Sequence, residues 1–149
     1  MAVTIDRLND SDKPAWRALY NGYAAFYKMP MTDETADRVW GWLHDPAHVL
    51  EALVARNETG KPIGLAHFRA MPSPLRGASA GFLDDLFVDP DVRGSGAADA
   101  LIRAINVLAK ERGWPVVRWI TADNNYRARG VYDRLATRSM WITYEMKPE

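Results

Sequence analysis

Residues 82–112 read FLDDLFVDPDVRGSGAADALIRAINVLAKER, and this stretch decides the fold of the chain. Its first seven residues are mostly apolar and end at an Asp-Pro turn, which predicts a strand over residues 82–88. Residues 97–112 predict an amphipathic helix, because positions 98, 101, 102, 105, 108 and 109 are apolar and share one face. Gly113 is typical of a helix end, and residues 116–121 predict another strand. A strand, a helix and a strand in succession predict a parallel pair joined by a right-handed crossover.

The rest of the chain predicts more strands and helices around this crossover. Residues 3–8 and 50–56 have the apolar patterns of strands, and residues 63–71 return from 50–56 through a loop that contains Gly60. Helices are expected to start near residues 12 and 32 and to span residues 125–135. Residues 72–80 are expected to form a surface loop, and residues 140–146 a final strand. We therefore expect an α/β fold, a mixed sheet flanked by helices, in a single domain over residues 1–149.

The composition excludes several kinds of protein. Lys plus Arg number 19, as do Asp plus Glu, so no excess of charge points to a nucleic acid or a membrane surface as a partner. The chain has no cysteine, which excludes disulfides and thiolate chemistry, and its three histidines are scattered, so no metal is expected. No apolar run approaches the length of a membrane span, and the first residues lack the pattern of a secretory leader. We expect a cytoplasmic protein.

The segment Arg93-Gly94-Ser95-Gly96-Ala97-Ala98 has the features of a phosphate-binding loop. Glycines allow the backbone to turn so that successive N–H groups point in one direction. The helix that follows adds its unpaired first N–H groups and the positive end of its dipole. The small alanines let a diphosphate approach, and the arginine can add positive charge. We therefore expect this loop to bind a pyrophosphate.

Other phosphate-binding loops fit this segment less well. A Walker loop is excluded, because no Gly-Lys-Ser/Thr follows the glycines. A dinucleotide-binding turn is disfavoured, because Asp99 would occupy its third small position and residues 89–92 separate the glycines from the strand. A plain strand-to-helix turn, in which glycine serves only the backbone geometry, remains an alternative.

The loop and a downstream helix resemble the two signatures of the GNAT acetyltransferases. Residues 93–98 are similar to the family's Gln/Arg-x-x-Gly-x-Gly/Ala loop, which binds the pyrophosphate of coenzyme A. The segment Asn125-x-x-Ala128-x-x-x-Tyr132 resembles the family's Asn-x-x-Ala-x-x-x-Tyr helix, and its three residues share one helical face. Taken alone, Tyr132 is more typical of a core tyrosine. The chain departs from the family after this helix, where residues 136–137 replace a glycine-containing turn.

This resemblance implies a GNAT fold and an N-acetyltransferase that uses acetyl-CoA as its cosubstrate. Tyr132 would be the general acid that protonates the departing coenzyme A thiolate. Backbone N–H groups of residues 86–88 would stabilise the negative charge that forms on the thioester oxygen. The residues expected to bind the cosubstrate are Leu86, Phe87, Val88, Arg93, Gly94, Ser95, Gly96, Ala97, Ala98, Asn125 and Ala128.

Two adjacent carboxylates, Asp84 and Asp85, interrupt the apolar strand. In a regular strand they point to opposite faces, unless a β-bulge re-aims one of them. A buried carboxylate needs a partner, so an internal hydrogen bond or ion pair is an alternative role for each. The strand also resembles Leu-Glu-Asp-Leu-Phe-Val of the polyamine and small-amine acetyltransferases, and Trp141-x-x-Tyr144 is similar to the ending of that subgroup.

By that resemblance Asp84 receives the proton of the acceptor amine, and Asp85 is the next candidate. An alkylammonium has a pKa of about 10 and must lose a proton before it attacks a thioester. A carboxylate can bind the cation and accept the proton through a water molecule. The expected acceptor is therefore a small or polyamine-like primary amine. A protein or peptide amine, and a noncatalytic acyl-CoA-binding module, remain alternatives.

Other residues are weaker candidates for the site. Tyr20, Tyr23 and Tyr27 have a helical spacing that is more typical of a core, although the first helices of the resembling family line the acceptor cleft. His67 is expected to be a structural histidine of a strand and a weaker candidate base. By the same resemblance, exposed strand edges and the aromatic final strand predict a homodimer.

Overall fold

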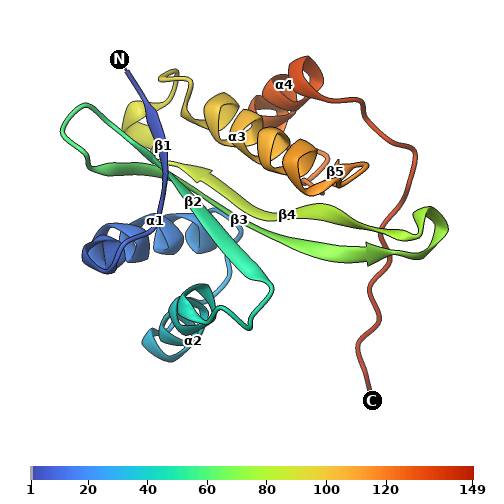
Figure 1. Ribbon diagram of the computed structural model, residues 1–149. Coiled ribbons are helices and arrows are strands. Elements are labelled where there is room, and N and C mark those ends of the chain that lie inside the picture. The colour runs from blue at the N-terminus through green and yellow to red at the C-terminus, as the bar shows by residue number, and fades with distance from the viewer. Residues whose placement is uncertain (1) are drawn as a thin grey trace.

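The computed structural model describes residues 2–149 and folds them into one sheet with helices on both faces (Figure 1). The five strands lie in the order β1-β2-β3-β4-β5. Their bounds are Thr4–Arg7 for β1, Leu50–Arg56 for β2, Pro62–Ser73 for β3, Ala78–Val88 for β4 and Val117–Arg118 for β5. The helices are α1 (Lys13–Phe26), α2 (Asp33–His44), α3 (Ala97–Arg112) and α4 (Tyr126–Leu135), with the 3-10 turns η1 (Asp10–Asp12), η2 (Pro74–Arg76) and η3 (Pro90–Val92).

The sheet is mixed, which confirms the expected fold. Strands β1 to β4 pair antiparallel, and β5 pairs parallel to β4 after the crossover through α3. Strands β3 and β4 are longer than expected, so the loop expected at residues 72–80 is largely a hairpin. Gly77 adopts φ 60° after η2 and closes the turn, which lets pairing continue to the last residue of β3.

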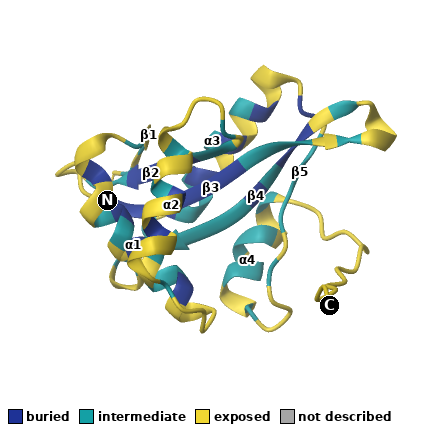
Figure 2. Cartoon of the chain, turned by 90° about the horizontal axis from the view of Figure 1, so that it is seen from below, coloured by how far each residue is buried: buried dark blue, intermediate teal, exposed yellow. Residues whose placement is uncertain are grey.

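Each face of the sheet has its own core. Helices α1 and α2 cover one face, where Trp16 and Leu19 pack with Leu65 of β3. Helix α3 covers the other face, where Leu101 and Ile105 are almost wholly buried, as the helical spacing predicts (Figure 2). Within residues 2–149, no helix combines the length and the apolar character that crossing a membrane requires.

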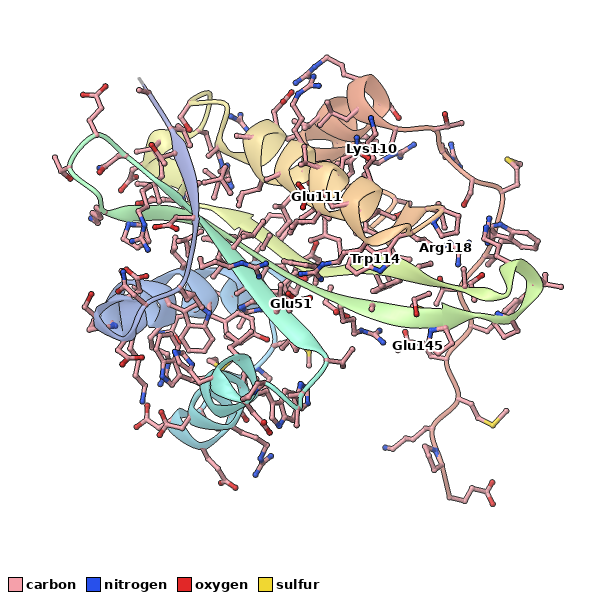
Figure 3. The ribbon with its side chains drawn as sticks, viewed as in Figure 1. Glu51, Lys110, Glu111, Trp114, Arg118 and Glu145 are labelled. Atoms are coloured by element: carbon pink, nitrogen blue, oxygen red, sulfur yellow. The ribbon has the colours of Figure 1, made fainter. Side chains whose placement is uncertain are left out.

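Strand β5 holds only two residues and is shorter than expected. Trp114 lies in the connection after α3 (Figure 3). It packs against Gly81 of β4 so closely that a Cβ on Gly81 would lie 2.6 Å from Trp114 Cε3. The Gly81 N–H also donates to the Val116 carbonyl oxygen at 2.9 Å. After β5 ends at Arg118, the chain diverges from β4 on the way to α4 (Figure 2). The divergence leaves the second half of β4 with an open outer edge.

The final strand expected over residues 140–146 is not formed, so that prediction is wrong. Residues 137–149 adopt no regular secondary structure and run past the end of the sheet (Figure 1). Trp141 and Tyr144 are exposed, and Glu145 lies on the same tail (Figure 3). A strand needs a neighbour to pair its backbone groups, and within this chain the edge of β5 offers only two residues. Propensity alone therefore does not make this segment a strand.

Candidate active site

The loop between β4 and α3 turns tightly and faces open space. Gly94 has φ 85° and Gly96 has φ 82°, in the left-handed region that favours glycine. A Cβ added at either position would meet no atom within 4 Å. The buried Ala97 starts α3, and the Ala100 N–H donates to the Gly96 carbonyl oxygen at 2.9 Å. The N–H groups at the start of the first helical turn have no acceptor within the helix and can bind an anion.

The end of β4 directs backbone donors away from β3. The Asp89 N–H donates to the Ile63 carbonyl oxygen of β3 at 2.8 Å. Backbone groups alternate in direction along an antiparallel ladder, so the N–H groups of Leu86 and Val88 point to the opposite edge. Strand β5 pairs only with Gly81 and Phe82, so no strand covers this edge at Leu86 and Val88. These donors therefore face the space beside the loop.

A cleft of about 450 Å³ joins this strand edge, the loop and α4. Every residue that the sequence predicted for the cosubstrate lines it, together with Tyr132. These lining residues are Leu86, Phe87, Val88, Arg93, Gly94, Ser95, Gly96, Ala97, Ala98, Asn125, Ala128 and Tyr132. The cleft has further lining residues that were not predicted from the sequence, namely Phe26, Asp99, Arg127, Val131 and Arg134. A signal was present in α4, because Arg127, Val131 and Arg134 recur at helical spacing beside the signature residues.

Tyr132 reaches the cleft from α4 as a neutral phenol. Its ring packs edge-to-face on Trp119, with ring centroids 5.4 Å apart. Burial, followed by the electrostatic effect of the neighbouring Tyr27 phenol, raises the pKa of Tyr132 to about 12. The phenol therefore keeps its proton at neutral pH and is able to donate it. At the start of the same helix, the Asn125 amide donates to Thr121 Oγ1 at 3.4 Å.

A β-bulge places both carboxylates of β4 on one face of the sheet. His67 stands opposite Asp85 and Phe68 stands opposite Leu83, so Asp84 is the extra residue. Side chains do not alternate across a bulge. Asp84 and Asp85 therefore both lie on the face that α1 covers, and the expectation of opposite faces is wrong. The β-bulge, an exception that was expected to be possible in this strand, accounts for the difference.

Asp85 ends a chain of buried hydrogen bonds. Its carboxylate lies 2.7 Å from His67 Nδ1, and the Trp16 indole N–H donates to His67 Nε2 at 2.9 Å. Trp16 and His67 are fully buried. From α1, Tyr20 and Tyr23 also face Asp85: burial, and then the charge of this carboxylate, raises the pKa of both phenols. His67 is thus tied to a candidate catalytic residue, which the sequence did not reveal.

Asp84 has a different partner. The Arg69 Nε–H donates to both of its oxygens, at 3.0 and 3.2 Å, and the guanidinium lies over the Phe82 ring at 5.0 Å from its centroid. Burial raises the pKa of Asp84 above its ordinary value, although Arg69 acts in the opposite direction. The two neighbouring carboxylates therefore occupy different environments, one beside a guanidinium and one beside an imidazole.

Tyr23 connects the carboxylates to the cleft. Asp84 and Asp85 are not among the residues that line it, but Tyr23 is, and its hydroxyl donates to the Asp84 backbone carbonyl oxygen at 3.4 Å. Tyr27 of α1 lines the cleft as well. Helical spacing made a core role more typical for these tyrosines, yet two of them form a wall of the candidate site. Among residues 2–149, no group of three or more His, Cys, Asp or Glu side chains could hold a metal ion.

A sequence model of the acetyltransferase (GNAT) family matches residues 16–136. The chain belongs to the GNAT acetyltransferases. As a GNAT enzyme it is an acetyl-CoA-dependent N-acetyltransferase, and acetyl-CoA is its cosubstrate. The matched region runs from α1 to the residue after α4 and so contains the loop, the strand edge and both carboxylates.

Known acetyltransferases resemble this GNAT enzyme over almost its whole length. A D-amino-acid N-acetyltransferase of Saccharomyces cerevisiae is 29% identical over 144 residues, which are 96% of this chain and 89% of that protein. The crystal structure of a ribosomal-protein-alanine N-acetyltransferase from Brucella melitensis biovar Abortus 2308 has a TM-score of 0.81 and 28% identity, and 99% of each chain is covered. An aminoglycoside N-acetyltransferase in complex with CoA has a TM-score of 0.80 and 20% identity, over 98% of this chain and 95% of that one, and shows the same fold.

The cleft of this GNAT enzyme fits the chemistry of its cosubstrate. The open space before Gly94 and Gly96 admits a bulky anion against the backbone, which a side chain at either glycine would obstruct. Arg93, Arg127 and Arg134 add positive charge to the lining. The apolar part of the lining comes from β4, α1 and α4. It suits the uncharged part of acetyl-CoA between the pyrophosphate and the thioester at the strand edge.

Proposed function

We propose that this enzyme transfers an acetyl group from acetyl-CoA to the primary amine of a small molecule in one direct step. The observation that supports this most strongly is that the glycine loop, the free edge of β4 and Tyr132 line the same cleft. Two carboxylates of β4 lie next to Tyr23, which lines this cleft as well. The proposal treats residues 1–149 as a single catalytic domain. The family match over residues 16–136 supports this extent.

The glycine loop would hold the pyrophosphate through backbone N–H groups of residues 94–98, with Arg93 beside it. The bound cosubstrate supplies a thioester carbonyl, the electrophile of the reaction. Leu86 and Val88 offer N–H groups on the open edge of β4, which suit the negative charge that develops on the carbonyl oxygen. Asn125 and Ala128 would line the path of the cosubstrate on α4, where the small alanine leaves room.

Asp84 would accept the proton of the ammonium through a water molecule, as the resemblance to small-amine acetyltransferases implies. Its raised pKa supports this role, because a base whose pKa lies nearer to the working pH accepts a proton more readily. The freed amine forms a bond to the carbonyl carbon as the carbon–sulfur bond breaks. Tyr132 donates its proton to the departing sulfur, and the acylated nitrogen loses its second proton, which returns through water to the Tyr132 oxygen.

Asp85 would supply a second negative charge next to the proton acceptor. Its neighbours are the His67 ring and two phenols, and an anionic carboxylate is the acceptor that suits such donors. Two carboxylates on one face of the sheet attract a cation more strongly than either alone. We therefore assign the ammonium group of the acceptor to the neighbourhood of this pair.

The resemblance to a D-amino-acid N-acetyltransferase supports a small molecule with a primary amine, a class that includes the polyamines suggested by the strand sequence. A second candidate is the amine of a protein terminus. The ribosomal-protein-alanine N-acetyltransferase, at 28% identity and TM-score 0.81, favours it. A noncatalytic acyl-CoA-binding module is less consistent with the site, because Tyr132 and the paired carboxylates serve no purpose in binding alone.

We also propose that the enzyme forms a homodimer and is located in the cytoplasm. The tail carries a run of exposed apolar and aromatic side chains, Met140, Trp141, Ile142, Tyr144 and Met146. A segment with strand propensity and no partner strand in this chain suits pairing with a second copy of the chain. The ordinary globular composition, 48% hydrophobic and 26% charged, supports the cytoplasmic location.

Turnover by the purified enzyme tests the function. Acetyl-CoA is mixed in turn with putrescine, D-phenylalanine, kanamycin and a short peptide that begins with alanine, and free thiol is measured. We expect thiol release with at least one of the small amines, together with the acetylated product by mass spectrometry. Acetylation of the peptide alone would favour the second candidate. Acetyl-CoA binding without transfer to any amine would leave the binding module as the better description.

A further inference from the structure

We propose that Trp16 and His67 are positioning residues that hold the Asp85 carboxylate in place to bind the ammonium group of the acceptor. This inference rests on the proposed function, because it assigns a specific task to one of the two carboxylates. It follows from the direction of the hydrogen bonds that run from α1 through β3 to the bulge of β4.

The contacts of His67 with Trp16 and Asp85 fix its tautomer. An indole N–H is a donor only, so the His67 Nε2 atom at 2.9 Å must act as the acceptor. A neutral imidazole carries its single proton on the other nitrogen, here Nδ1. This proton points along the 2.7 Å contact to the Asp85 carboxylate. The Trp16 donor and the acceptor-only Asp85 carboxylate therefore require the same tautomer, in which His67 donates to Asp85.

Packing holds this chain rigid. Trp16 and His67 are fully buried, and the Trp16 ring packs on Trp40 with centroids 5.1 Å apart. Tyr20 meets the His67 ring edge-on at 4.9 Å. The imidazole consequently has no room to turn, and the carboxylate that it holds keeps one orientation.

The groups around Asp85 indicate what its remaining oxygen surface would bind. Tyr20 and Tyr23 of α1 approach as neutral phenols, Asp84 adjoins it in β4, and Arg69 of β3 is engaged by Asp84. The Asp85 side chain keeps 18% of its surface exposed, whereas His67 keeps none. A cation at the exposed side would meet one carboxylate held by His67 and a second able to take its proton. The bulge is what places both within reach of a single ammonium.

Two substitutions of His67 separate positioning from plain packing. In His67→Asn the short amide can place an N–H near the position of Nδ1 and still donate to Asp85. In His67→Gln the longer amide reaches towards Trp16 and leaves Asp85 without its donor. We expect His67→Gln to raise the KM for the best amine of the panel about tenfold or more, since a lost hydrogen bond to a charged group has about this effect. The KM for acetyl-CoA should not change, and His67→Asn should restore most of the amine KM.

His44→Gln is the matched control, because His44 also contacts a tryptophan ring, Trp40 at 4.2 Å, but is exposed at the end of α2. It should leave both KM values unchanged. Equal effects of the Gln and Asn substitutions at His67, or an unchanged amine KM in both, would overturn the inference. If the wild-type enzyme acetylates no amine, the proposed function fails instead.

A measurement on the wild-type protein tests the hydrogen-bonded chain without turnover. Nitrogen NMR of labelled histidine at about pH 8, where an ordinary imidazole is neutral, distinguishes the two tautomers. We expect the Nδ1–H form for His67 in the wild type and also in Trp16→Phe, because the acceptor-only Asp85 carboxylate still requires it. The amine KM of Trp16→Phe should rise severalfold, because the His67 ring loses its hydrogen bond to α1. An Nε2–H form in the wild type would contradict the hydrogen-bond direction on which the inference depends, even if a His67 variant failed to fold.

Discussion

Asp84 and Asp85 are neighbours in sequence with different environments. The Arg69 Nε–H donates to both carboxylate oxygens of Asp84, and burial raises the pKa of Asp84. Asp85 accepts from His67 at the end of a buried chain. Carboxylates with separate environments can take separate roles in one reaction, one binding charge and the other moving a proton. The bulge provides this division, because it puts both side chains on the α1 face.

The role of Asp84 predicts a pH-dependent defect. Asp84→Asn keeps the shape of the side chain and removes its charge and basicity. We expect the rate loss to be largest at low pH, where free amine is scarcest, and to shrink as rising pH supplies neutral amine from solution. In the wild type, activity should fall as pH drops through the raised pKa of Asp84, because only the ionised form accepts a proton. A pH–rate profile for both proteins measures this.

The corresponding change at Asp85 provides the comparison. Asp85→Asn should raise the amine KM, and it also disturbs His67, so its melting temperature is measured in parallel. A flat profile for Asp84→Asn, combined with a pH-dependent loss in kcat for Asp85→Asn at unchanged melting temperature, would transfer the role of proton acceptor to Asp85.

Tyr132→Phe tests the general acid. It keeps the ring against Trp119 and removes the proton that the departing thiolate needs. We expect kcat to fall about 100-fold or more, with acetyl-CoA affinity nearly unchanged, because the proton matters only as the carbon–sulfur bond breaks. Stopped-flow turnover and a binding titration measure the two quantities. Full activity in the variant would make Tyr132 a packing residue.

Because the pKa of Tyr132 is raised to about 12, its own deprotonation should not limit the rate near neutral pH.

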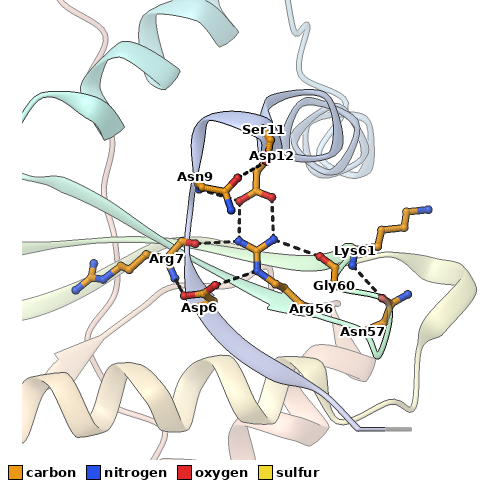
Figure 4. A network of polar contacts seen from close by, with 9 residues as sticks. All are labelled: Asp6, Arg7, Asn9, Ser11, Asp12, Arg56, Asn57, Gly60 and Lys61. Carbon is orange, nitrogen blue, oxygen red and sulfur yellow. Dashed lines mark hydrogen bonds and ion pairs between the residues drawn. The ribbon is translucent and has the colours of Figure 1, made fainter.

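At the scale of elements, an ion-pair cluster around Arg56 joins the start of the chain to the first hairpin (Figure 4). The guanidinium donates to both oxygens of Asp12 at 2.7 and 2.8 Å, to Asp6 at 3.2 Å, and to the carbonyl oxygens of Arg7 and Gly60. It thus links β1, η1 and the loop between β2 and β3. This cluster fixes the position at which α1 begins, and α1 carries the tyrosine wall of the cleft.

Asp12→Ala should therefore destabilise the fold. Breaking a buried pair by removing one partner typically costs about 3–5 kcal/mol, and the more exposed Asp6 compensates only part of the Arg56 charge. Hydrogen bonds from Arg56 hold the pKa of Asp12 below its usual value. A carboxyl with a lowered folded pKa adds stability above its unfolded pKa of about 3.9 and loses it as pH falls through the folded value. Denaturation should show the full difference from wild type near neutral pH and a smaller one under acid.

Glu34→Gln is a suitable control for this stability measurement. Its pair with Arg38 is on the surface, with the Glu34 side chain 82% exposed. Exposed pairs contribute about 0–1 kcal/mol, so little change is expected. Equal effects of the two substitutions, or a difference for Asp12→Ala that does not depend on pH, would show that the Arg56 cluster does not stabilise the molecule in this way.

At the scale of the whole molecule, the exposed tail predicts self-association. We expect the wild-type chain to be dimeric by light scattering, and Trp141→Asp to shift it towards monomer, because a charge opposes burial of this side chain. Leu75→Asp is the control, since Leu75 is fully exposed at the tip of the β3–β4 hairpin, outside the tail. A monomeric wild type, or a dimer unaffected by Trp141→Asp, would contradict the proposed role of the tail.

Local patterns were sufficient for most of the fold but not for features that depend on distant partners. The spacing of apolar residues predicts α3 correctly because the helix buries one regular face, and the two glycines predict the loop because positive φ favours glycine. The bulge at Asp84 depends on the register with His67, which no local pattern in β4 specifies. Residues 140–146 have strand propensity without a partner strand in this chain. Trp16 and Arg69 were not predicted as site neighbours, and His67 was expected only as a weaker candidate base, because each belongs to a segment distant from β4 in sequence.

The cleft around the glycine loop is expected to bind acetyl-CoA. Titration of acetyl-CoA into the wild type, Gly96→Val and Gly60→Val tests this most directly by calorimetry. Gly60 is a matched site, because it has φ 86° and open space like Gly96 but lies in the β2–β3 loop away from the cleft. Both substitutions impose the same kind of backbone strain. We predict that Gly96→Val loses tenfold or more in affinity, about 1.4 kcal/mol or more, whereas Gly60→Val binds like the wild type. Unchanged affinity in a folded Gly96→Val protein, or an equal loss in both variants, would contradict the account.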